Sequence, residues 1–362
     1  MRSLRSITVL VILLIGLLTT YATPSTATTI SRLDAAADCA AEGAHCVFLP
    51  WMRIPAPPPT LQELATIPGN IATVELSGSH AYISQDDVLY VVDVTNSRQP
   101  EVVGGHRFTG LRLPVVRDIE VRPPLAYVST LDRFTSCCFD AQLHLLDIAQ
   151  PTQPQVITST ATFGGLDIEV VDQRVYSTGF TWIYSTPDLV IHDVINASKF
   201  QARGTFGFNG SSSIAVNDSI VYVADYLNGI NVLDVSDPDH IVRPAIVGTP
   251  GAAYHVAIDG AYLYVATSEV LAIFDIAAPQ APALRSVRQL PGFPTDLEVA
   301  SGRAYVSLDP GGVAILDVRN PDEPELLTTY PVAGTAYAVE VDDSLIYLAT
   351  SSGLQIVQVT AP

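Results

Sequence analysis

The sequence predicts an all-β fold, a seven-bladed β-propeller, from three observations. A unit of about 42 residues recurs seven times, a repeat length typical of propeller blades with four short strands. One apolar segment per unit carries a tyrosine, at Tyr82, Tyr127, Tyr176, Tyr222, Tyr264, Tyr305 and Tyr347. The next apolar segment ends in Asp in six units, at Asp93, Asp147, Asp193, Asp234, Asp275 and Asp317, whereas the seventh has Gln358.

Each unit is expected to provide four strands in a fixed order. The first begins nine residues before the tyrosine, the second contains the tyrosine, the third ends at the Asp, and the fourth follows a proline-containing turn. The third strands are continuously apolar, which is typical of strands covered on both faces by neighbouring blades. Because Asp before a turn accepts hydrogen bonds from backbone N–H groups about two residues further on, we interpret the repeated Asp as structural, not catalytic.

The two ends of the repeat region are expected to share the seventh blade. The last unit has three strands, and residues 61–67 resemble the segment that leads through the outermost strand of the sixth unit. We therefore expect N-to-C strand closure, with residues 61–67 pairing beside residues 354–359 and covering two open sheet edges. Residues 61–362 then form one domain, preceded by an N-terminal segment with a Pro-rich spacer at residues 28–60.

The third-strand segments resemble those of a known family. "LYVVDV", "INVLDV" and "LAIFDI", each preceded by an "AYVS"-like strand and followed by a Pro turn, are similar to the LVIVD-repeat family of exported or surface-associated bacterial and archaeal β-propellers. The resemblance covers residues 61–362, although units two and three carry insertions and unit seven lacks the Asp. It implies a propeller and a surface location. The family carries no shared catalytic motif, so the resemblance implies no active-site residue.

The N-terminus has the composition of a secretory signal peptide, expected at residues 1–27. Arg2 and Arg5 precede an apolar run at residues 7–18, and small residues end at Ala27, the expected cleavage site. The run is short for a membrane span, so we expect no stable membrane insertion after cleavage, with an uncleaved anchor as the alternative. We expect a secreted or cell-surface-associated protein and a monomer.

The net charge limits the possible partners, and the cysteine content indicates whether disulfides form. The net charge is −19, and it becomes −21 when Arg2 and Arg5 leave with the signal. This negative charge excludes nucleic acid as a partner, because nucleic acid binds to basic patches, and it favours solubility, cation binding or a basic partner.

In an oxidising compartment the four cysteines predict two disulfides. We favour Cys39 with Cys46 and Cys137 with Cys138; the alternative links the N-terminal segment to the second pair.

A candidate binding site lies where the first strands begin. Those positions are Thr73, Asp118, Asp167, Ser213, His255, Asp296 and Ala338. Two residues further on, and on the same side of each strand, five units have Glu: Glu75, Glu120, Glu169, Glu298 and Glu340. We name Asp118, Asp167, His255 and Asp296 as ligand-binding candidates. The carboxylates would suit Ca²⁺, and no other cofactor is expected; the alternative is that they bond the backbone of adjacent blades.

Two long loops form the second part of this site. From tyrosine to Asp the second unit takes 20 residues and the third 17, against the usual 11 or 12. The loops, expected at residues 130–142 and 179–188, include Phe134, Phe139, Trp182 and Tyr184. They are expected side by side at the end where Asp118 and Asp167 lie. Aromatic loops on a rigid scaffold would bind a protein, a carbohydrate or a small molecule. The alternative is that these side chains only pack on each other.

The sequence carries no GxSxG hydrolase motif, no HExxH metalloprotease motif and no GxGxxG or GxxxxGK(S/T) nucleotide-binding motif. The function that we predict is therefore a non-enzymatic binding or protein-interaction module at or outside the cell surface. One alternative is a hydrolase or lyase that uses the carboxylates and His255 as general acid and base, because propellers also host enzymes. The other alternative is a purely structural envelope protein.

Overall fold

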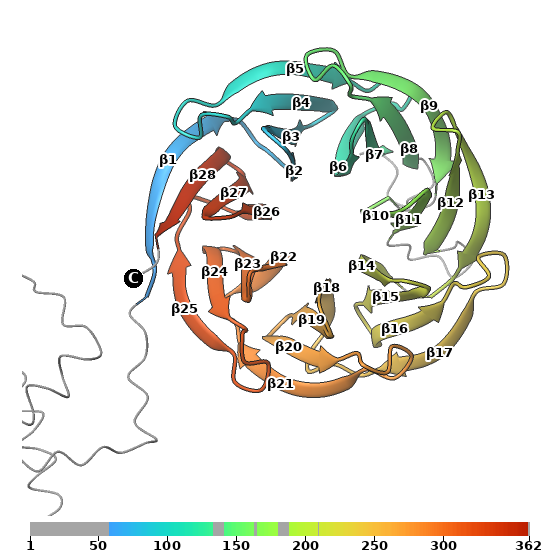
Figure 1. The fold of residues 1–362 in the computed structure, drawn as a ribbon, viewed down its shortest axis with the longest axis vertical. Helices are drawn as coiled ribbons and strands as arrows, with labels where there is room; N and C mark the ends of the chain where they lie inside the picture. Colours follow the sequence, from blue (N-terminus) through green and yellow to red (C-terminus); the bar gives the residue numbers. More distant parts are fainter. Residues whose placement is uncertain (1–57, 133–140, 163–164, 180–187, 209, 361–362) are drawn as a thin grey trace, which may run out of the picture. The chain divides into compact units, whose positions relative to one another are not determined.

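The computed structural model describes residues 58–132, 141–162, 165–179, 188–208 and 210–360, and these form a ring of seven four-stranded antiparallel sheets (Figure 1). The chain divides into two units, Met1–Ala56 and Pro57–Pro362, and the ring belongs to the second. The predicted seven-bladed β-propeller is confirmed. Within the described ranges no helix is long and apolar enough to cross a membrane.

The blades follow one another along the chain and around the ring. Blade 1 contains β2 (Val74–Ser77), β3 (His80–Gln85), β4 (Val88–Asp93) and β5 (Glu101–Arg107); blade 2 contains β6 (Pro114–Arg122), β7 (Leu125–Asp132), β8 (Ala141–Asp147) and β9 (Gln155–Thr162). Blade 3 contains β10 (Asp167–Val171), β11 (Arg174–Thr178), β12 (Leu189–Ile195) and β13 (Lys199–Phe206); blade 4 contains β14 (Ser211–Asn217), β15 (Ile220–Asp225), β16 (Gly229–Asp234) and β17 (Val242–Val247). Blade 5 contains β18 (Ala253–Asp259), β19 (Tyr262–Thr267), β20 (Val270–Asp275) and β21 (Ala283–Gln289); blade 6 contains β22 (Phe293–Ala300), β23 (Arg303–Asp309), β24 (Gly312–Asp317) and β25 (Glu325–Tyr330). Blade 7 contains β26 (Ala336–Asp342), β27 (Leu345–Thr350), β28 (Gly353–Thr360) and, as its outermost strand, β1 (Thr60–Pro68).

The closure of the ring is also confirmed. In blade 7, β1 runs antiparallel to β28, with Leu61 opposite Val359 and Ile67 opposite Leu354. Leu61 packs against the cluster between blades 6 and 7, while Leu64 and Ile67 pack against the cluster between blades 7 and 1. The strand from the N-terminal end therefore covers the open edge of β28 and contributes to two blade interfaces.

The hydrophobic core lies between the blades. Each of the seven clusters of buried apolar side chains is shared by two neighbouring blades. The repeated tyrosine is at most 3% exposed in every blade and packs against the blade that follows. The hydroxyl of Tyr222 in blade 4 also donates a 2.8 Å hydrogen bond to the carbonyl of Pro279 in blade 5. These contacts explain why a tyrosine recurs once per unit.

The Asp at the end of the third strand holds the corner that follows it, as predicted. In blades 1, 2, 4, 5 and 6 its Oδ1 accepts the backbone N–H two residues further on, at 2.8–3.0 Å. Asp193 of blade 3 differs, because it accepts from Arg174 at 2.9 Å and from Arg203 at 2.8 Å. The repeated Asp is thus a structural residue in all six positions.

Candidate functional site

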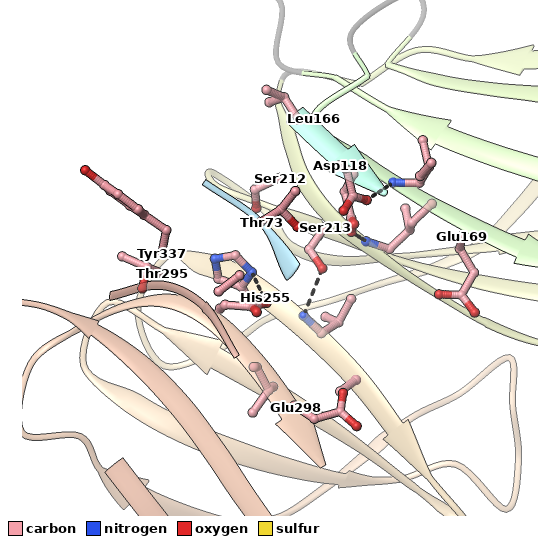
Figure 2. Close-up of a pocket in the computed structure, with 18 of the residues that line it drawn as sticks. Thr73, Asp118, Leu166, Glu169, Ser212, Ser213, His255, Thr295, Glu298 and Tyr337 are labelled. Atoms are coloured by element: carbon pink, nitrogen blue, oxygen red, sulfur yellow. Dashed lines mark hydrogen bonds and ion pairs between the residues drawn. The ribbon is translucent and has the colours of Figure 1, made fainter. Parts of the chain in front are cut away.

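The first strands of the seven blades surround a central cavity of about 860 Å³. Its lining forms three levels along the axis of the ring. The mouth is formed by Ala72, Arg117, Leu166, Ser212, Tyr254, Thr295 and Tyr337, each one residue before a predicted ring position. The middle level, the Asp ring, contains Asp118, Asp167 and Asp296, and the deeper level, the Glu ring, contains Glu75, Glu120, Glu169, Glu298 and Glu340. Figure 2 shows this order, from Tyr337 and Thr295 past Ser213 and His255 to Glu169 and Glu298.

The Asp ring joins the blades to one another. Asp118 Oδ2 accepts the backbone N–H of Ile168 at 2.7 Å, and each of these residues lies in the first strand of its blade. Asp167 Oδ2 accepts from Ile214 at 2.7 Å, and Asp296 Oδ2 accepts from Val339 at 2.9 Å. The hydroxyl of Ser213 does the same for Val256 at 3.3 Å (Figure 2). Four of the predicted ring positions therefore bond the backbone of the next blade, the alternative that the sequence had left open.

These hydrogen bonds have a simple physical origin. The first strand of a blade pairs with the second strand on one side only, so its N–H groups on the other side have no partner within their own sheet. In five blades the register shifts just before the ring residue, which is the signature of a β-bulge. The bulged residues include Arg117, Ser212, Tyr254, Thr295 and Tyr337, all of which line the mouth. In these five blades the bulge thus aims one side chain at the mouth.

The Glu ring is a cluster of carboxyl groups that repel one another. Burial is the main cause that raises the pKa of Glu75 and of Glu169 to about 7, of Glu298 to about 8 and of Glu120 to about 10. Glu340 hydrogen-bonds to Glu75, and burial with the charge of Glu75 raises the pKa of Glu340 well above its ordinary value. Two neighbouring blades therefore share a proton between carboxyl groups at this level.

Arg122 compensates part of this charge on one side of the channel. Its Nη1 lies 2.8 Å from Glu120 Oε2 and 3.7 Å from Glu75 Oε1, and its side chain is 48% exposed. Both acidic partners belong to blades 1 and 2. The guanidinium therefore sits at one sector of the Glu ring and not at its centre.

Asp118 and Asp167 form a second carboxyl pair, in the Asp ring. Burial and the charge of Asp167 raise the pKa of Asp118 well above its ordinary value, while burial raises the pKa of Asp167 to about 6. The two side chains hydrogen-bond to each other in addition to their backbone contacts. At neutral pH the pair therefore holds about one proton.

Blades 4 and 5 interrupt both rings. In place of Asp and Glu, blade 4 has Ser213 and Ala215, and blade 5 has His255 and Ala257. His255 Nδ1 lies 3.7 Å from Asp296 Oδ1, and burial lowers the pKa of His255 although Asp296 opposes this effect. The sector formed by these four residues, which we call the notch, is small and uncharged when His255 is neutral.

An aromatic cluster stands at the mouth beside the notch. Tyr226, Tyr254 and Phe293, which we call the aromatic shelf, come from blades 4, 5 and 6. The ring centroids of Tyr226 and Tyr254 are 5.4 Å apart, those of Tyr254 and Phe293 are 4.5 Å apart, and both pairs meet edge to face. Tyr226 is 42% and Phe293 41% exposed, so the shelf presents apolar area to solvent.

The hairpin that carries Tyr226 is held by a buried carboxylate. Asp225 Oδ1 accepts the backbone N–H groups of Leu227 at 3.0 Å and of Asn228 at 3.1 Å. Its Oδ2 accepts from the side-chain amides of Asn228 at 3.0 Å and of Asn231 at 2.8 Å. Asp225 thus positions Tyr226 on the shelf.

Several predicted site residues lie outside the described residues. Phe134, Phe139, Trp182 and Tyr184 are among them, and so are Cys39, Cys46, Cys137 and Cys138. The first loop was predicted at residues 130–142, but β7 continues to Asp132 and β8 begins at Ala141, with Thr130 opposite Gln142. The prediction was wrong at both ends, because strand pairing extends further than the ordinary repeat length indicates.

The aromatic shelf was not predicted from the sequence. Tyr254 stands one residue before the ring position of its unit and Phe293 three residues before, while Tyr226 follows the second strand of blade 4. An alignment of the seven units on their tyrosines would have placed Tyr254 and Tyr337 at equivalent positions. Their exposure could not be read from that alignment.

The structure describes no group of three Asp, Glu, His or Cys side chains that could hold one metal ion, within the residues that it covers. The Asp-ring oxygens that accept backbone N–H groups are also engaged already. Ca²⁺ in the channel stays a prediction of the sequence.

Comparison with known proteins agrees with this architecture. The LVIVD repeat matches residues 68–105, 210–249, 250–287 and 291–332, which lie in blades 1, 4, 5 and 6. The chain is an LVIVD-repeat β-propeller. In this LVIVD-repeat propeller the two units with insertions and the unit without the terminal Asp are those that the repeat does not match.

Solved structures show the same fold at low identity. A chain of the mitotic checkpoint complex is 12% identical with a TM-score of 0.63, covering 93% of this chain and 99% of that one. The computationally designed protein Ika8 is 11% identical with a TM-score of 0.56, covering 82% of this chain and 98% of that one. Because 1235 chains match, the likeness selects no function. No curated protein matches the sequence.

Proposed function

We propose that this LVIVD-repeat propeller is an exported, non-enzymatic binding module and that the mouth of its channel is the binding face. LVIVD repeats on a propeller suggest a binding or interaction module. The observation that carries the proposal is the aromatic shelf, which is exposed beside a cavity of about 860 Å³. Exposed aromatic clusters at a rim of polar residues are typical of interaction sites.

The scaffold under the shelf is rigid, which suits a binding face. Tyr254 lies at a bulge in β18, which pairs with β19 on both sides of that residue, and Asp225 holds the hairpin of Tyr226. Large aromatic side chains on a fixed backbone lose little conformational entropy on binding. A partner at the mouth would therefore gain contact area without ordering the propeller.

The hydrolase or lyase alternative has less support from the same residues. A general acid or base needs a carboxyl oxygen or a ring nitrogen that reaches the substrate. Asp118, Asp167 and Asp296 each give an oxygen to the backbone of the next blade. Loss of any of them would disturb blade packing, so a structural role accounts for their recurrence.

Export rests on the N-terminal sequence. Arg2, Arg5 and the apolar run at residues 7–18 have the composition of a signal peptide, and the acidic charge suits a secreted or surface-associated protein. We expect the exported protein to begin at Thr28. Intact-mass measurement of protein recovered outside the cytoplasm checks this start, and a full-length mass would contradict the cleavage.

Binding at the mouth is testable with a peptide library displayed on phage. The wild-type protein should enrich peptides that no longer bind when Phe293 or Tyr226 is replaced by Ser. Leu284→Ser is the matched control, because Leu284 is 52% exposed on the outer strand β21, away from the channel. Enriched peptides that bind the shelf variants as well as the wild type would contradict the proposed binding face.

A further inference from the structure

We propose that the mouth takes the side chain of an arginine or lysine presented by a partner protein, with its apolar stem on the aromatic shelf and its cationic head in the notch. This inference rests on the proposed binding face and names the chemistry of the ligand. The two parts of such a side chain match two neighbouring surfaces of the channel.

The aromatic shelf can contact the apolar stem of an arginine or lysine side chain, and it can attract the cationic head as it enters the mouth. Tyr226, Tyr254 and Phe293 present apolar area from three adjacent blades, and Tyr254 and Phe293 also line the cavity. Arginine and lysine bury their methylene stems along apolar surfaces while the charged head stays in a polar place. Aromatic rings also attract a cation that approaches their faces.

The notch provides the space below the shelf. At the level of the Glu ring, blades 4 and 5 have Ala215 and Ala257 where five blades have Glu. Two carboxyl side chains are therefore replaced by methyl groups on the blades that carry Tyr226 and Tyr254. Figure 2 shows Glu169 and Glu298 projecting from the strands on the two sides of this sector. A cationic head in the notch would lie between these two carboxyl groups.

The charges of the channel select a cation. The Asp ring and the Glu ring carry eight carboxyl groups, and the ion pairs of Arg122 lie at blades 1 and 2, away from the notch. The charges that act on Glu298, from Asp296, Glu75, Glu169 and Asp259, are all negative and help to raise its pKa. A bound cation would relieve this repulsion, so the Glu ring should release protons when the ligand binds. A neutral ligand would leave the ring protonated.

The test uses two peptides that differ only in charge, acetyl-Gly-Gly-Arg-Gly-Gly-amide and the same peptide with citrulline. Titration calorimetry of the mature protein at pH 7 should show at least ten-fold tighter binding of the arginine peptide. Repeating the titration in buffers of different ionisation enthalpy should show proton release for the arginine peptide. Its affinity should also increase from pH 6 to pH 8, because the Glu ring ionises in this range.

Variants distinguish binding of the peptide in the notch from its general attraction to an acidic protein. Ala257→Gln fills the notch and should weaken the arginine peptide at least ten-fold, as should Glu298→Gln, which removes one flanking carboxylate. Phe293→Ala should weaken it about five-fold, and Leu284→Ala should leave it unchanged. Melting temperatures of all variants show that they are folded, and Glu298→Gln keeps the test valid if Ala257→Gln does not fold.

The outcomes distinguish this inference from the proposed function. Equal affinity for the arginine and citrulline peptides overturns the cationic ligand. If peptides from the phage library still depend on Phe293, the binding face remains. An arginine peptide that binds the notch and shelf variants as tightly as the wild type is attracted by overall charge alone, and this overturns the inference. If no peptide depends on Phe293, both proposals fail.

Discussion

Replacing Glu298 by Gln should stabilise the protein at pH 8, although it alters a residue that lines the central cavity. Burial and the charges of Asp296, Glu75 and Glu169 raise the pKa of Glu298 from 4.5 to about 8. Gln has nearly the same shape and stays uncharged at every pH. The substitution therefore removes the repulsion and leaves the packing of β22 in place.

Linkage between protonation and folding determines whether Glu298 raises or lowers the free energy of unfolding at each pH. Below pH 4.5 the carboxyl is protonated in the folded and the unfolded chain, so it has no effect on stability. Between pH 4.5 and about 8 the folded protein keeps a proton that the unfolded chain has lost, so the free energy of unfolding falls as the pH rises. Above about pH 8 both states are ionised and the penalty is constant.

The size of the stability change follows from the same pKa values of Glu298. The change in pKa from 4.5 to about 8 corresponds to at most about 5 kcal/mol, at ~1.36 kcal/mol per pKa unit. Glu298 lines an open cavity in which solvent screens part of the repulsion. We therefore expect a gain of about 1 to 3 kcal/mol at pH 8 and no gain at pH 4.5.

Urea denaturation of the wild type and the variant at pH 4.5, 6, 7 and 8 measures this difference. Glu101→Gln is the matched control, because Glu101 is exposed at the start of the outer strand β5. It removes the same formal charge and should leave the pH dependence of stability unchanged. A Glu298→Gln protein that is less stable than the wild type at pH 8, or that keeps the full wild-type pH slope, would refute the reasoning.

Three further predictions concern the ring, the blade contacts and the cysteines. Deleting residues 28–67 should lower the melting temperature far more than deleting residues 28–54, because only the first deletion removes most of β1 and exposes β28; equal melting temperatures would contradict the closure. Asp167→Ala should cost about 1 to 3 kcal/mol in urea denaturation, because the N–H of Ile214 loses its acceptor, whereas Asp167→Asn keeps an acceptor and should cost less; equal losses would argue against the blade contact. The exported protein should show no free thiol under denaturing, non-reducing conditions, and two or more thiols per chain would exclude the predicted disulfides.

The fold was predictable from the sequence because the same pattern recurs in successive units. The tyrosine, the third-strand Asp and the Pro turn recur at nearly constant spacing, so each unit supports the interpretation of the others. The corner Asp was also predictable, because its hydrogen bond spans two residues and depends on local backbone alone. Asp193 departs from this rule because Arg174 and Arg203 compete for its oxygens, and Arg203 lies on a different strand from Asp193.

The role of the Asp ring could not be decided in the same way. A metal site and a backbone contact both place carboxylates at the start of the first strands. The partner of Asp118 is 50 residues away in sequence, in the next blade, and the donor is a backbone N–H that leaves no mark in the sequence. Ile168 lies on the first strand of its blade, and its N–H points away from the paired strand β11, which is seen only when the strands are placed in space.

The sequence by itself determined the number of blades, the closure by β1 and the residues that recur, because these depend on short-range patterns repeated along one chain. The tertiary structure alone decided which side chains meet at the mouth. Tyr226, Tyr254 and Phe293 belong to three blades, and they touch because each blade packs at a set angle against the next. Contacts of this kind depend on the orientation between sheets, which no single repeat encodes.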